Sequence, residues 1–326
     1  MKKINILITG AAGFIGFHLC KSLLNDHKFN IFGIDNINSY YDTELKENRI
    51  KILKKNISFK FKKIDIINFK KLNNFTKINK IKIVIHLAAQ AGVRHSFKNT
   101  DNYFDSNILG FYNILKITRD LNIKHLLYAS TSSVYGESAK FPLKENFNTD
   151  QPESFYAATK KINEIMAYSF SKNFNCKISG MRFFTVYGPY GRPDMSYYSF
   201  TKKMINDENI DIYNYGNNTR DFTYVDDIII YIKKLIFKPP LNKVSFEIYN
   251  LGNTMPINII NMVNTLKKIL KSNSKIMLKP KQPGDVVKTH SSIIKIQSKL
   301  GKHKHTNLKK GLIEFVNWYK KYYAKK

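Results

Sequence analysis

The sequence is short of cysteine and of long apolar runs, and each shortage excludes a class of protein. No stretch reaches the roughly 18–20 consecutive apolar residues of a membrane-spanning helix, so we expect no membrane insertion. The two cysteines, Cys20 and Cys176, form no CxxC pair, which favours buried free thiols in a reducing compartment over a thiolate metal site. The basic start resembles a secretory signal, but its apolar run at 4–9 leads directly into a glycine turn. We therefore expect a cytoplasmic protein.

Acidic residues are also scarce, with 24 Asp and Glu against 54 Lys and Arg, and the net charge is +30. A charge of this size is typical of proteins that bind nucleic acid or an acidic membrane surface. The lysines, however, are spread along the whole chain among Asn and Ile and form no basic patch with interleaved aromatics. We expect neither nucleic acid nor membrane as a partner, although a broad positive field would attract an anionic small substrate.

Arginine is the rarest of the cationic residues. A chain that otherwise uses lysine is expected to keep arginine where a planar, bidentate donor must bind phosphate or carboxylate. Arg49 and Arg119 are the two that are most easily explained as ordinary surface cations. The six arginines are Arg49, Arg94, Arg119, Arg182, Arg192 and Arg220.

Short apolar segments alternate with amphipathic ones in the first half of the chain, which predicts βαβ units and a doubly wound α/β fold with a parallel sheet. Beyond about residue 186 the pattern loosens, which predicts a first lobe at 1–185 and a smaller lobe at 186–326, with possible chain crossings between them. The expected strands are 3–9, 30–35, 57–65, 82–88, 124–130 and 177–184. The expected helices are 14–25, 43–55, 68–77, 101–121, 154–173, 196–207, 226–236, 256–271, 291–300 and 307–323.

A glycine turn follows the first expected strand. Gly10, Gly13 and Gly16 open a helix, where glycine allows a tight turn and a close approach to a pyrophosphate at the helix N-terminus. Asp35 ends the next strand, where an acid accepts hydrogen bonds from ribose hydroxyls and repels a 2′-phosphate; this favours NAD over NADP. Asp65 and Ile66, at the end of the third expected strand, either contact the edge of the adenine ring or belong to an ordinary turn.

A tyrosine and a lysine four residues apart form the candidate catalytic pair. Tyr156 and Lys160 would share one face of a helix, so that the ammonium could lower the pKa of the phenol. The hydroxyl run at 130–133 ends a strand at the carboxyl edge of the sheet, where open α/β folds bind ligands. The pair is common by chance, but its order after the glycine turn, Asp35 and the hydroxyl run indicates a reaction site.

Together these motifs resemble the extended short-chain dehydrogenases/reductases, and most of all the UDP-glucuronate 4-epimerases. The resemblance runs nearly end to end, through TGAAGFIG, HLAAQAGVR, SNILG, ASTSSVYGE, YAATKKINE, RFFTVYGPYGRPDM, TRDFTYVDD and QPGDV. It implies a Rossmann-type NAD-binding domain at 1–185 that carries the catalytic residues, and a lobe at 186–326 that mainly binds a nucleotide sugar. By resemblance the catalytic residues are Thr131, Tyr156 and Lys160, and NAD would contact Gly10, Gly13, Phe14, Ile15, Gly16, Asp35, Asp65, Ile66, Leu87, Ala88, Ala89, Asn107, Tyr156 and Lys160.

The implied chemistry is a transient oxidation at the sugar 4-position, with rotation of the 4-keto sugar and return of hydride to its other face. Relatives that eliminate water carry an Asp-Glu pair after the threonine, and relatives that decarboxylate carry a glutamate there. This chain has Ser132 and Ser133 instead, which favours epimerisation. The resemblance implies conversion of UDP-glucuronate to UDP-galacturonate for surface polysaccharide synthesis. The alternatives are a 4-epimerase of UDP-glucose or a UDP-N-acetylhexosamine, a UDP-glucuronate decarboxylase, a nucleotide-sugar 4,6-dehydratase and a non-enzymatic NAD-binding scaffold.

The resemblance also implies the substrate contacts. Thr185 and Arg192 match positions that bind the sugar carboxylate, although Arg192 could instead contact the diphosphate. The resemblance implies a homodimer formed by the helices near 101–121 and 154–173. No metal is expected, because no histidine spacing resembles a ligand set. The expected substrate-binding residues are Arg94, Ser132, Ser133, Thr185, Arg192, Arg220, Gln282 and Asp285.

Overall fold

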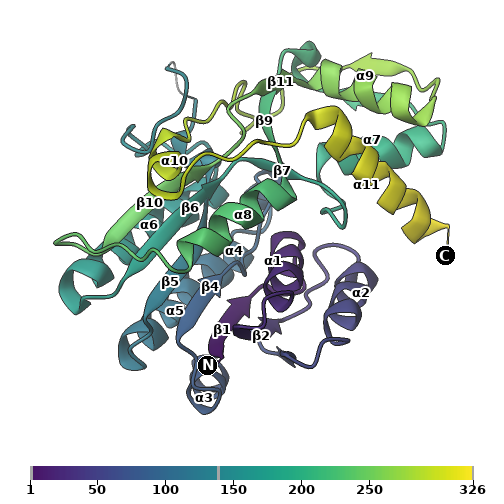
Figure 1. Ribbon diagram of the computed structural model, residues 1–326. Helices are drawn as coiled ribbons and strands as arrows, with labels where there is room; N and C mark the ends of the chain where they lie inside the picture. Colours follow the sequence, from purple (N-terminus) through teal and green to yellow (C-terminus); the bar gives the residue numbers. More distant parts are fainter. Residues whose placement is uncertain (1–2, 138–139, 325–326) are drawn as a thin grey trace.

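The computed structural model describes residues 3–137 and 140–324. Its centre is a parallel sheet with the strand order β10-β6-β5-β4-β1-β2-β3 and helices on both faces (Figure 1). Within the sheet, β2 and β3 lie on one side of β1, and β4 lies on the other. The strand order therefore reverses between β1 and β4, which leaves a crevice at the carboxyl ends of these two strands. The strands of this sheet are β1 Ile4–Thr9, β2 Phe29–Asp35, β3 Phe59–Lys63, β4 Ile83–His86, β5 His125–Thr131, β6 Ile178–Phe183 and β10 Phe246–Leu251.

Two apolar cores cover the two faces of the sheet. One core contains side chains of α1, α2, α8 and α10, and the other contains side chains of α3, α5 and α6. Because both faces are covered, the central strands β1 and β4 are nearly continuous apolar runs. These helices are α1 Phe14–Leu24, α2 Thr43–Leu53, α3 Phe69–Ile78, α5 Gly110–Asp120, α6 Phe155–Phe174, α8 Val225–Leu235 and α10 Ile294–Leu300.

A smaller lobe with its own aromatic-rich core lies at the upper right of Figure 1. Its strands form a sheet in the order β11-β9-β7 and a two-stranded pair of β12 with β8. The elements of this lobe are β7 Thr185–Tyr187, α7 Ser196–Ile205, β8 Ile210–Ile212, β9 Thr219–Tyr224, β11 Pro256–Asn258, α9 Ile259–Leu270, β12 Ile276–Leu278 and α11 Leu308–Tyr323. Short helical segments are η1 Arg94–Phe97, α4 Thr100–Tyr103, η2 Phe104–Leu109, η3 Ser132–Tyr135 and η4 Asn214–Gly216.

The doubly wound α/β fold predicted from the sequence is confirmed, and the six expected strands end within a few residues of their predicted bounds. Strand β10, which adds an edge to the central sheet beside β6, was not predicted. The chain therefore crosses the expected boundary after residue 185, and the division at this point stays a prediction. The expected helix at 101–121 is wrong as one continuous helix, because the π-helical turn η2 separates α4 from α5.

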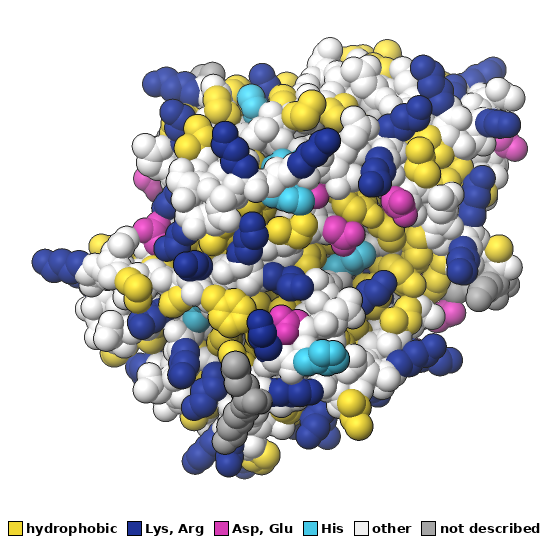
Figure 2. Space-filling view, viewed as in Figure 1, with side chains coloured by type: hydrophobic (Ala, Val, Ile, Leu, Met, Phe, Trp, Pro, Cys, Tyr) yellow, Lys and Arg dark blue, Asp and Glu magenta, His cyan; other side chains and the backbone are white. Residues whose placement is uncertain are grey.

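The positive charge is distributed over the molecule. Figure 2 shows lysine and arginine side chains scattered over the visible face, separated by apolar and neutral groups. On this face they form no single basic patch. Within the described ranges, no helix is both long enough and apolar enough to span a membrane.

Candidate active site

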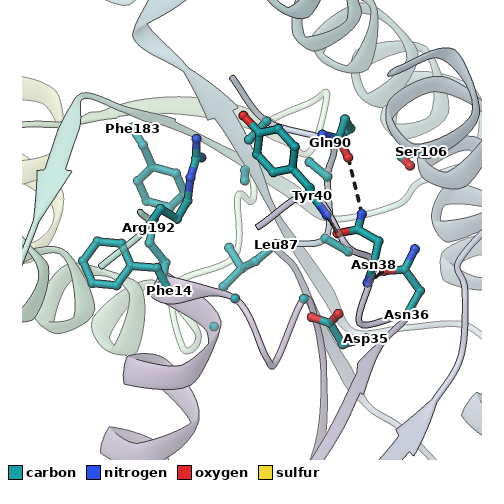
Figure 3. Close-up of a pocket in the computed structure, with 18 of the residues that line it drawn as sticks. Phe14, Asp35, Asn36, Asn38, Tyr40, Leu87, Gln90, Ser106, Phe183 and Arg192 are labelled. Carbon is teal, nitrogen blue, oxygen red and sulfur yellow. Dashed lines mark hydrogen bonds between the residues drawn. The ribbon is translucent and has the colours of Figure 1, made fainter. Parts of the chain in front are cut away.

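A deep cavity opens at the carboxyl ends of β1, β2, β4 and β5 (Figure 3). Fifteen of the predicted site residues line it. The cavity-lining residues that were predicted are Gly10, Gly13, Phe14, Ile15, Gly16, Asp35, Asp65, Ile66, Leu87, Ala88, Ala89, Thr131, Tyr156, Lys160 and Arg192. Those that were not predicted include Asn36, Asn38, Tyr40, Lys46, Gln90 and Ser106.

The glycine turn leaves no room for side chains at two of its positions. Gly10 has φ +72°, and a Cβ there would lie 2.7 Å from the backbone nitrogen of Ala88 on the neighbouring strand end. A Cβ on Gly16 would lie 2.1 Å from the carbonyl oxygen of Gly10. The close packing leaves the N-terminus of α1 open to the cavity, as a pyrophosphate requires.

Asp35 lies at the same end of the cavity as the glycine turn. Its carboxylate accepts hydrogen bonds from the backbone N–H of Ala12 at 3.1 Å and of Ile37 at 2.8 Å. Burial raises the pKa of Asp35, while these hydrogen bonds and the nearby Lys46 act in the opposite direction. The carboxylate therefore lies beside the glycine turn, where it can accept hydrogen bonds from the ribose hydroxyls of NAD. The glycine cradle and this acceptor together fit a dinucleotide.

Lys46 is a buried cation at the same end that sequence reasoning missed. Its Nζ donates to the backbone oxygen of Asn38 at 2.6 Å and to the Oδ1 of Asn38 at 2.7 Å. Burial lowers its pKa to about 8, against the opposing effect of Asp35. Asp65 accepts a hydrogen bond from Asn36 Nδ2 at 2.8 Å, so the turn after β3 is joined to the loop after β2.

The predicted catalytic residues come from β5 and α6. Thr131 ends β5, and Ser154 caps α6 by accepting a hydrogen bond from Ala157 N at 3.2 Å, which places Tyr156 in the first helical turn. Burial raises the pKa of Tyr156, whereas the charge of Arg192 and a hydrogen bond with Thr131 lower it. These two groups favour the phenolate that a general base requires.

Lys160 is hydrogen-bonded to the main chain of β5, and its predicted effect on the pKa of Tyr156 stays a prediction. Its Nζ donates to the carbonyl oxygen of Ala129 at 3.1 Å, and the cation that lowers the phenol pKa is Arg192. Burial lowers the pKa of Lys160 to about 8. Its side chain is only 1% exposed and lines the cavity, where it would hold a nicotinamide ribose.

The remaining members of the hydroxyl run have different surroundings. Ser130 donates to Glu164 Oε1 at 2.7 Å, and Glu164 forms a buried bidentate ion pair with Arg182. The hydroxyl of Ser133 lies 3.2 Å from the Thr131 hydroxyl, inside the turn η3. Ser132 and Ser133 are half-buried and do not line the cavity, and neither does Thr185 at the start of β7.

Asn107 occupies the π-helical turn η2 and is buried outside the cavity. Its side chain accepts from Gln90 N at 2.8 Å and donates to the Gln90 oxygen and the Thr159 hydroxyl, both at 3.0 Å. Asn107 therefore orients the strand end at Gln90, which itself lines the cavity.

Arg192 is held by a carboxylate of its own loop. Its Nε and Nη2 donate to Asp194 at 3.0 Å and 2.6 Å, and Tyr40 donates to the same carboxylate at 3.1 Å. Figure 3 shows the Arg192 guanidinium and the Tyr40 hydroxyl on the same side of the cavity, away from Asp35.

A second cluster of predicted substrate residues lies outside the cavity lining. Arg94 donates to Asp285 at 3.0 Å, Arg220 lies 3.6 Å from the same carboxylate, and Arg94 also stacks over the ring of Tyr213. The backbone of Gln282 accepts from Asp285 N at 3.3 Å. The four predicted residues thus form one group with two guanidinium cations beside an aromatic ring, which fits a nucleoside diphosphate.

The prediction that Arg49 is a surface cation is wrong. Its side chain is fully buried and donates to the carbonyl of Ala12 at 2.8 Å and to those of Tyr190 and Gly191 at 2.6 Å and 3.1 Å. It also donates to the Tyr41 hydroxyl at 2.8 Å. Arg49 therefore joins the glycine turn to the loop that carries Arg192.

Among the residues described, no group of three His, Cys, Asp or Glu side chains is placed to hold a metal.

Comparison with known proteins agrees with this arrangement. The model of the NAD dependent epimerase/dehydratase family matches residues 6–252. Protein CapI of Staphylococcus aureus is 43% identical over 336 residues, which cover 99% of this chain and 100% of that protein. UDP-glucuronate 4-epimerase 4 of Arabidopsis thaliana is 40% identical over 335 residues, which cover 98% of this chain and 76% of that protein.

Among solved structures, UDP-glucuronic acid 4-epimerase from Bacillus cereus in complex with UDP-glucuronic acid and NAD has a TM-score of 0.92 against this chain. The two sequences are 33% identical, and the match covers 98% of this chain and 100% of that one. The fold, with its Rossmann-type sheet and smaller lobe, is therefore shared over 98% of this chain.

Proposed function

Because the chain belongs to the NAD dependent epimerase/dehydratase family and is an NAD-dependent UDP-sugar 4-epimerase, we propose that its substrate is UDP-glucuronate and its product UDP-galacturonate. One observation carries this proposal: the guanidinium of Arg192 lines the same cavity as the phenol of Tyr156 and acts electrostatically on it. A uronate carboxylate at C5 would lie next to the reacting C4, so the cation that binds it must lie beside the base.

In the proposed mechanism, Tyr156 takes the proton of the sugar 4-hydroxyl while Thr131 hydrogen-bonds to the reacting oxygen. Bound NAD supplies the hydride acceptor for the oxidation and the donor for the return step. Lys160 would hold the cofactor ribose. The 4-keto sugar then rotates about its link to the diphosphate, and Tyr156 returns the proton, so the protein ends each turnover in its starting state.

The carboxylate explains why an arginine is needed here. A 4-keto glucuronate is a β-keto acid, which loses carbon dioxide when its C5–carboxylate bond aligns with the carbonyl π system. A bidentate Arg192 can hold the carboxylate out of that alignment.

The acids that would divert the ketone are absent at the positions after Thr131. Elimination of water needs an acid and a base, and Ser132 and Ser133 provide neither. The carboxylates of Asp35 and Asp65 line the opposite, ribose end of the cavity, and Glu164 is occupied by Arg182. This arrangement supports epimerisation over dehydration.

A neutral UDP-sugar is the second candidate substrate, and one observation favours it. Arg192 is already paired with Asp194, so its charge is compensated within the protein. If this compensation is complete, the cavity would accept UDP-glucose or a UDP-N-acetylhexosamine as readily as a uronate.

For the nucleotide end, we propose that Arg94 and Arg220 bind the diphosphate, while Gln282 and Asp285 bind the uridine ribose. The support is their clustering around Asp285 beside the Tyr213 ring. Binding of the diphosphate would then replace part of the interaction of these arginines with Asp285.

We also propose a homodimer formed through α5, α6 and the adjoining turn η2. Five large apolar side chains project there with exposed fractions between 41% and 58%, and α5 and α6 are joined by the ring contact of Tyr112 with Phe170. An exposed apolar face of this kind is typical of a subunit interface. The five side chains are Phe104, Leu109, Tyr112, Ile165 and Tyr168.

We propose a cytoplasmic location and a role in surface polysaccharide synthesis, because UDP-activated uronates are sugar donors.

The experiment that tests the substrate is replacement of Arg192 by Gln, which keeps hydrogen-bonding capacity but removes the charge. We expect kcat/KM for UDP-glucuronate to fall by about 10–100-fold, the loss of a charge-assisted hydrogen bond, with a smaller change for UDP-glucose. Equal losses for both sugars, or an unchanged rate with the uronate, would contradict a carboxylate role for Arg192.

A further inference from the structure

Asp194 and Tyr40 were not predicted as site residues, yet they fix the arginine that faces the catalytic tyrosine. The two oxygens of Asp194 accept from Nε and Nη2 of Arg192, at 3.0 Å and 2.6 Å. This fork-to-fork geometry fixes both the position and the plane of a guanidinium. Among the described residues, the third nitrogen, Nη1, has no hydrogen-bond partner, so one edge of the guanidinium is held and the other is available to a ligand.

Tyr40 holds Asp194 from a second loop. It belongs to the loop that follows β2, five residues after Asp35, and its hydroxyl donates to Asp194 Oδ2 at 3.1 Å. Its ring contacts the His95 ring at a centroid distance of 4.8 Å. A Cβ on Gly92 would lie 2.3 Å from the Tyr40 hydroxyl oxygen, so the chain leaves room for the tyrosine there by using glycine.

The carboxylate of Asp194 is charged in this arrangement. Burial opposes its ionisation, but the charge and hydrogen bonds of Arg192 and the hydrogen bond of Tyr40 hold its pKa below the usual range. The side chains of Arg192 and Asp194 are 23% and 31% exposed, so the pair is partly shielded from water. Such a pair keeps its geometry better than one on an open surface.

We infer that Asp194 and Tyr40 are positioning residues that hold Arg192 by its Nε–Nη2 edge, so that Nη1 meets the substrate carboxylate and keeps it out of line with the 4-keto group. This inference rests on the proposed function, because it requires a carboxylate on the substrate. The hydrogen bond between Tyr40 and Asp194 also connects the loop after β2 to the loop that carries Arg192.

The reaction that this arrangement prevents is decarboxylation of the 4-keto sugar. In that step the C5–C6 bond breaks, carbon dioxide leaves, and the electron pair forms an enolate across C5, C4 and the ketone oxygen. Protonation of C5 from water then gives a UDP-4-keto-pentose, and the hydride taken from C4 stays on the cofactor. Carbon dioxide and reduced cofactor therefore form in equal amounts when the pentose leaves unreduced.

The experiment compares wild type with Asp194→Ala, Asp194→Asn and Tyr40→Phe on UDP-glucuronate, and measures UDP-galacturonate by NMR, released carbon dioxide, and NADH absorbance. We expect the ratio of carbon dioxide to UDP-galacturonate to rise by about 10–100-fold in Asp194→Ala. The ratio should rise less in Asp194→Asn, whose oxygen still accepts one hydrogen bond, and least in Tyr40→Phe. The matched control is Asp120→Asn, which removes the negative charge from an Arg–Asp pair at 2.7 Å outside the cavity lining, and which should keep the wild-type ratio.

A merely structural role would lower the rate or the thermal stability without moving this ratio. Wild-type ratios in both Asp194 variants would overturn the inference, as would an unchanged ratio in Tyr40→Phe if the Asp194 variants do not fold. Failure of wild type to form UDP-galacturonate would instead overturn the proposed function. The assay therefore distinguishes the two failures, because wild type tests the proposed function and the variants test the inference.

Discussion

The guanidinium of Arg49 donates to the carbonyl oxygen of Ala12 at 2.8 Å and thereby ties helix α2 to the glycine turn. The same side chain donates to the carbonyls of Tyr190 and Gly191, which precede Arg192. One buried cation thus holds the cofactor turn and the sugar loop together, and its removal should affect both.

Arg49→Lys keeps a charge but cannot span these acceptors with a planar fork. We expect the free energy of unfolding to fall by about 2–4 kcal/mol, because buried carbonyl groups lose their partners. We also expect weaker NAD binding. Urea denaturation and NAD titration measure the two effects. Arg119→Lys, at a surface pair, is the control and should change stability by less than about 0.5 kcal/mol; equal effects in the two variants would contradict the account.

Tyr156→Phe should remove the base and leave the fold and the cofactor in place. We expect kcat to fall by about 10²–10⁴-fold, the contribution typical of a general base, while NAD still copurifies. The control Tyr215→Phe alters a side chain that is 58% exposed and does not line the cavity, and it should retain wild-type kcat. Substantial epimerisation by Tyr156→Phe would assign the proton transfer to another group.

Arg192→Gln and Asp194→Asn should move the pH profile in opposite directions. Arg192 lowers the pKa of Tyr156 and Asp194 raises it, although burial has the largest effect. Loss of the cation should therefore shift the acid limb of the kcat/KM profile to higher pH, and loss of the anion should shift it to lower pH. Shifts of the same sign would show that Tyr156 does not produce this limb.

Lys160→Met should abolish activity and stabilise the cofactor-free protein. Burial lowers the pKa of Lys160 from 10.5 to about 8, so the folded state binds this proton less tightly than the unfolded state. Below pH 8 the ammonium is charged in both states, and the cost to folding is of the order of 3 kcal/mol. Between pH 8 and 10.5 the folded state loses the proton first, and the cost disappears as pH rises. In thermal unfolding, Lys160→Met should be more stable than wild type at neutral pH, and this difference in stability should shrink toward pH 10.5. A difference in stability that does not depend on pH would contradict this interpretation.

Asp35→Asn should weaken selection of NAD against NADP. The neutral amide accepts less strongly from ribose hydroxyls, and we expect NAD affinity to fall by about 10-fold or more. It no longer repels a 2′-phosphate, and the nearby Lys46 cation favours one. Titration of both cofactors measures the affinity ratio, and a ratio equal to that of wild type would exclude Asp35 from cofactor selection.

The sequence predicts well those parts of the fold and site that depend on local pattern. The glycine turn, Asp35, Thr131 and the Tyr156–Lys160 pair all follow directly from strand ends or helix spacing, and the structure brings them to one cavity. The general doubly wound fold follows in the same way from the alternation of strands and helices.

The parts that could not be predicted depend on contacts between distant segments. Tyr40 and Asp194 are 154 positions apart, and neither carries a periodic signal that would connect them. Arg49 lies four residues from Leu45 and four from Leu53, so its spacing places it on the buried face of α2, but its charge suggested a surface position and its partners come from two distant loops. Strand β10 lies in the less regular half of the chain, so only its pairing with β6 identifies it as part of the central sheet.

The most direct test of the proposed substrate and reaction is product analysis by NMR after the purified enzyme is incubated separately with UDP-glucuronate, UDP-glucose and UDP-N-acetylglucosamine. The account predicts that UDP-glucuronate is converted to UDP-galacturonate fastest, without stoichiometric NADH and without carbon dioxide as a main product. Release of carbon dioxide as the main course, or faster conversion of a neutral sugar, would contradict it.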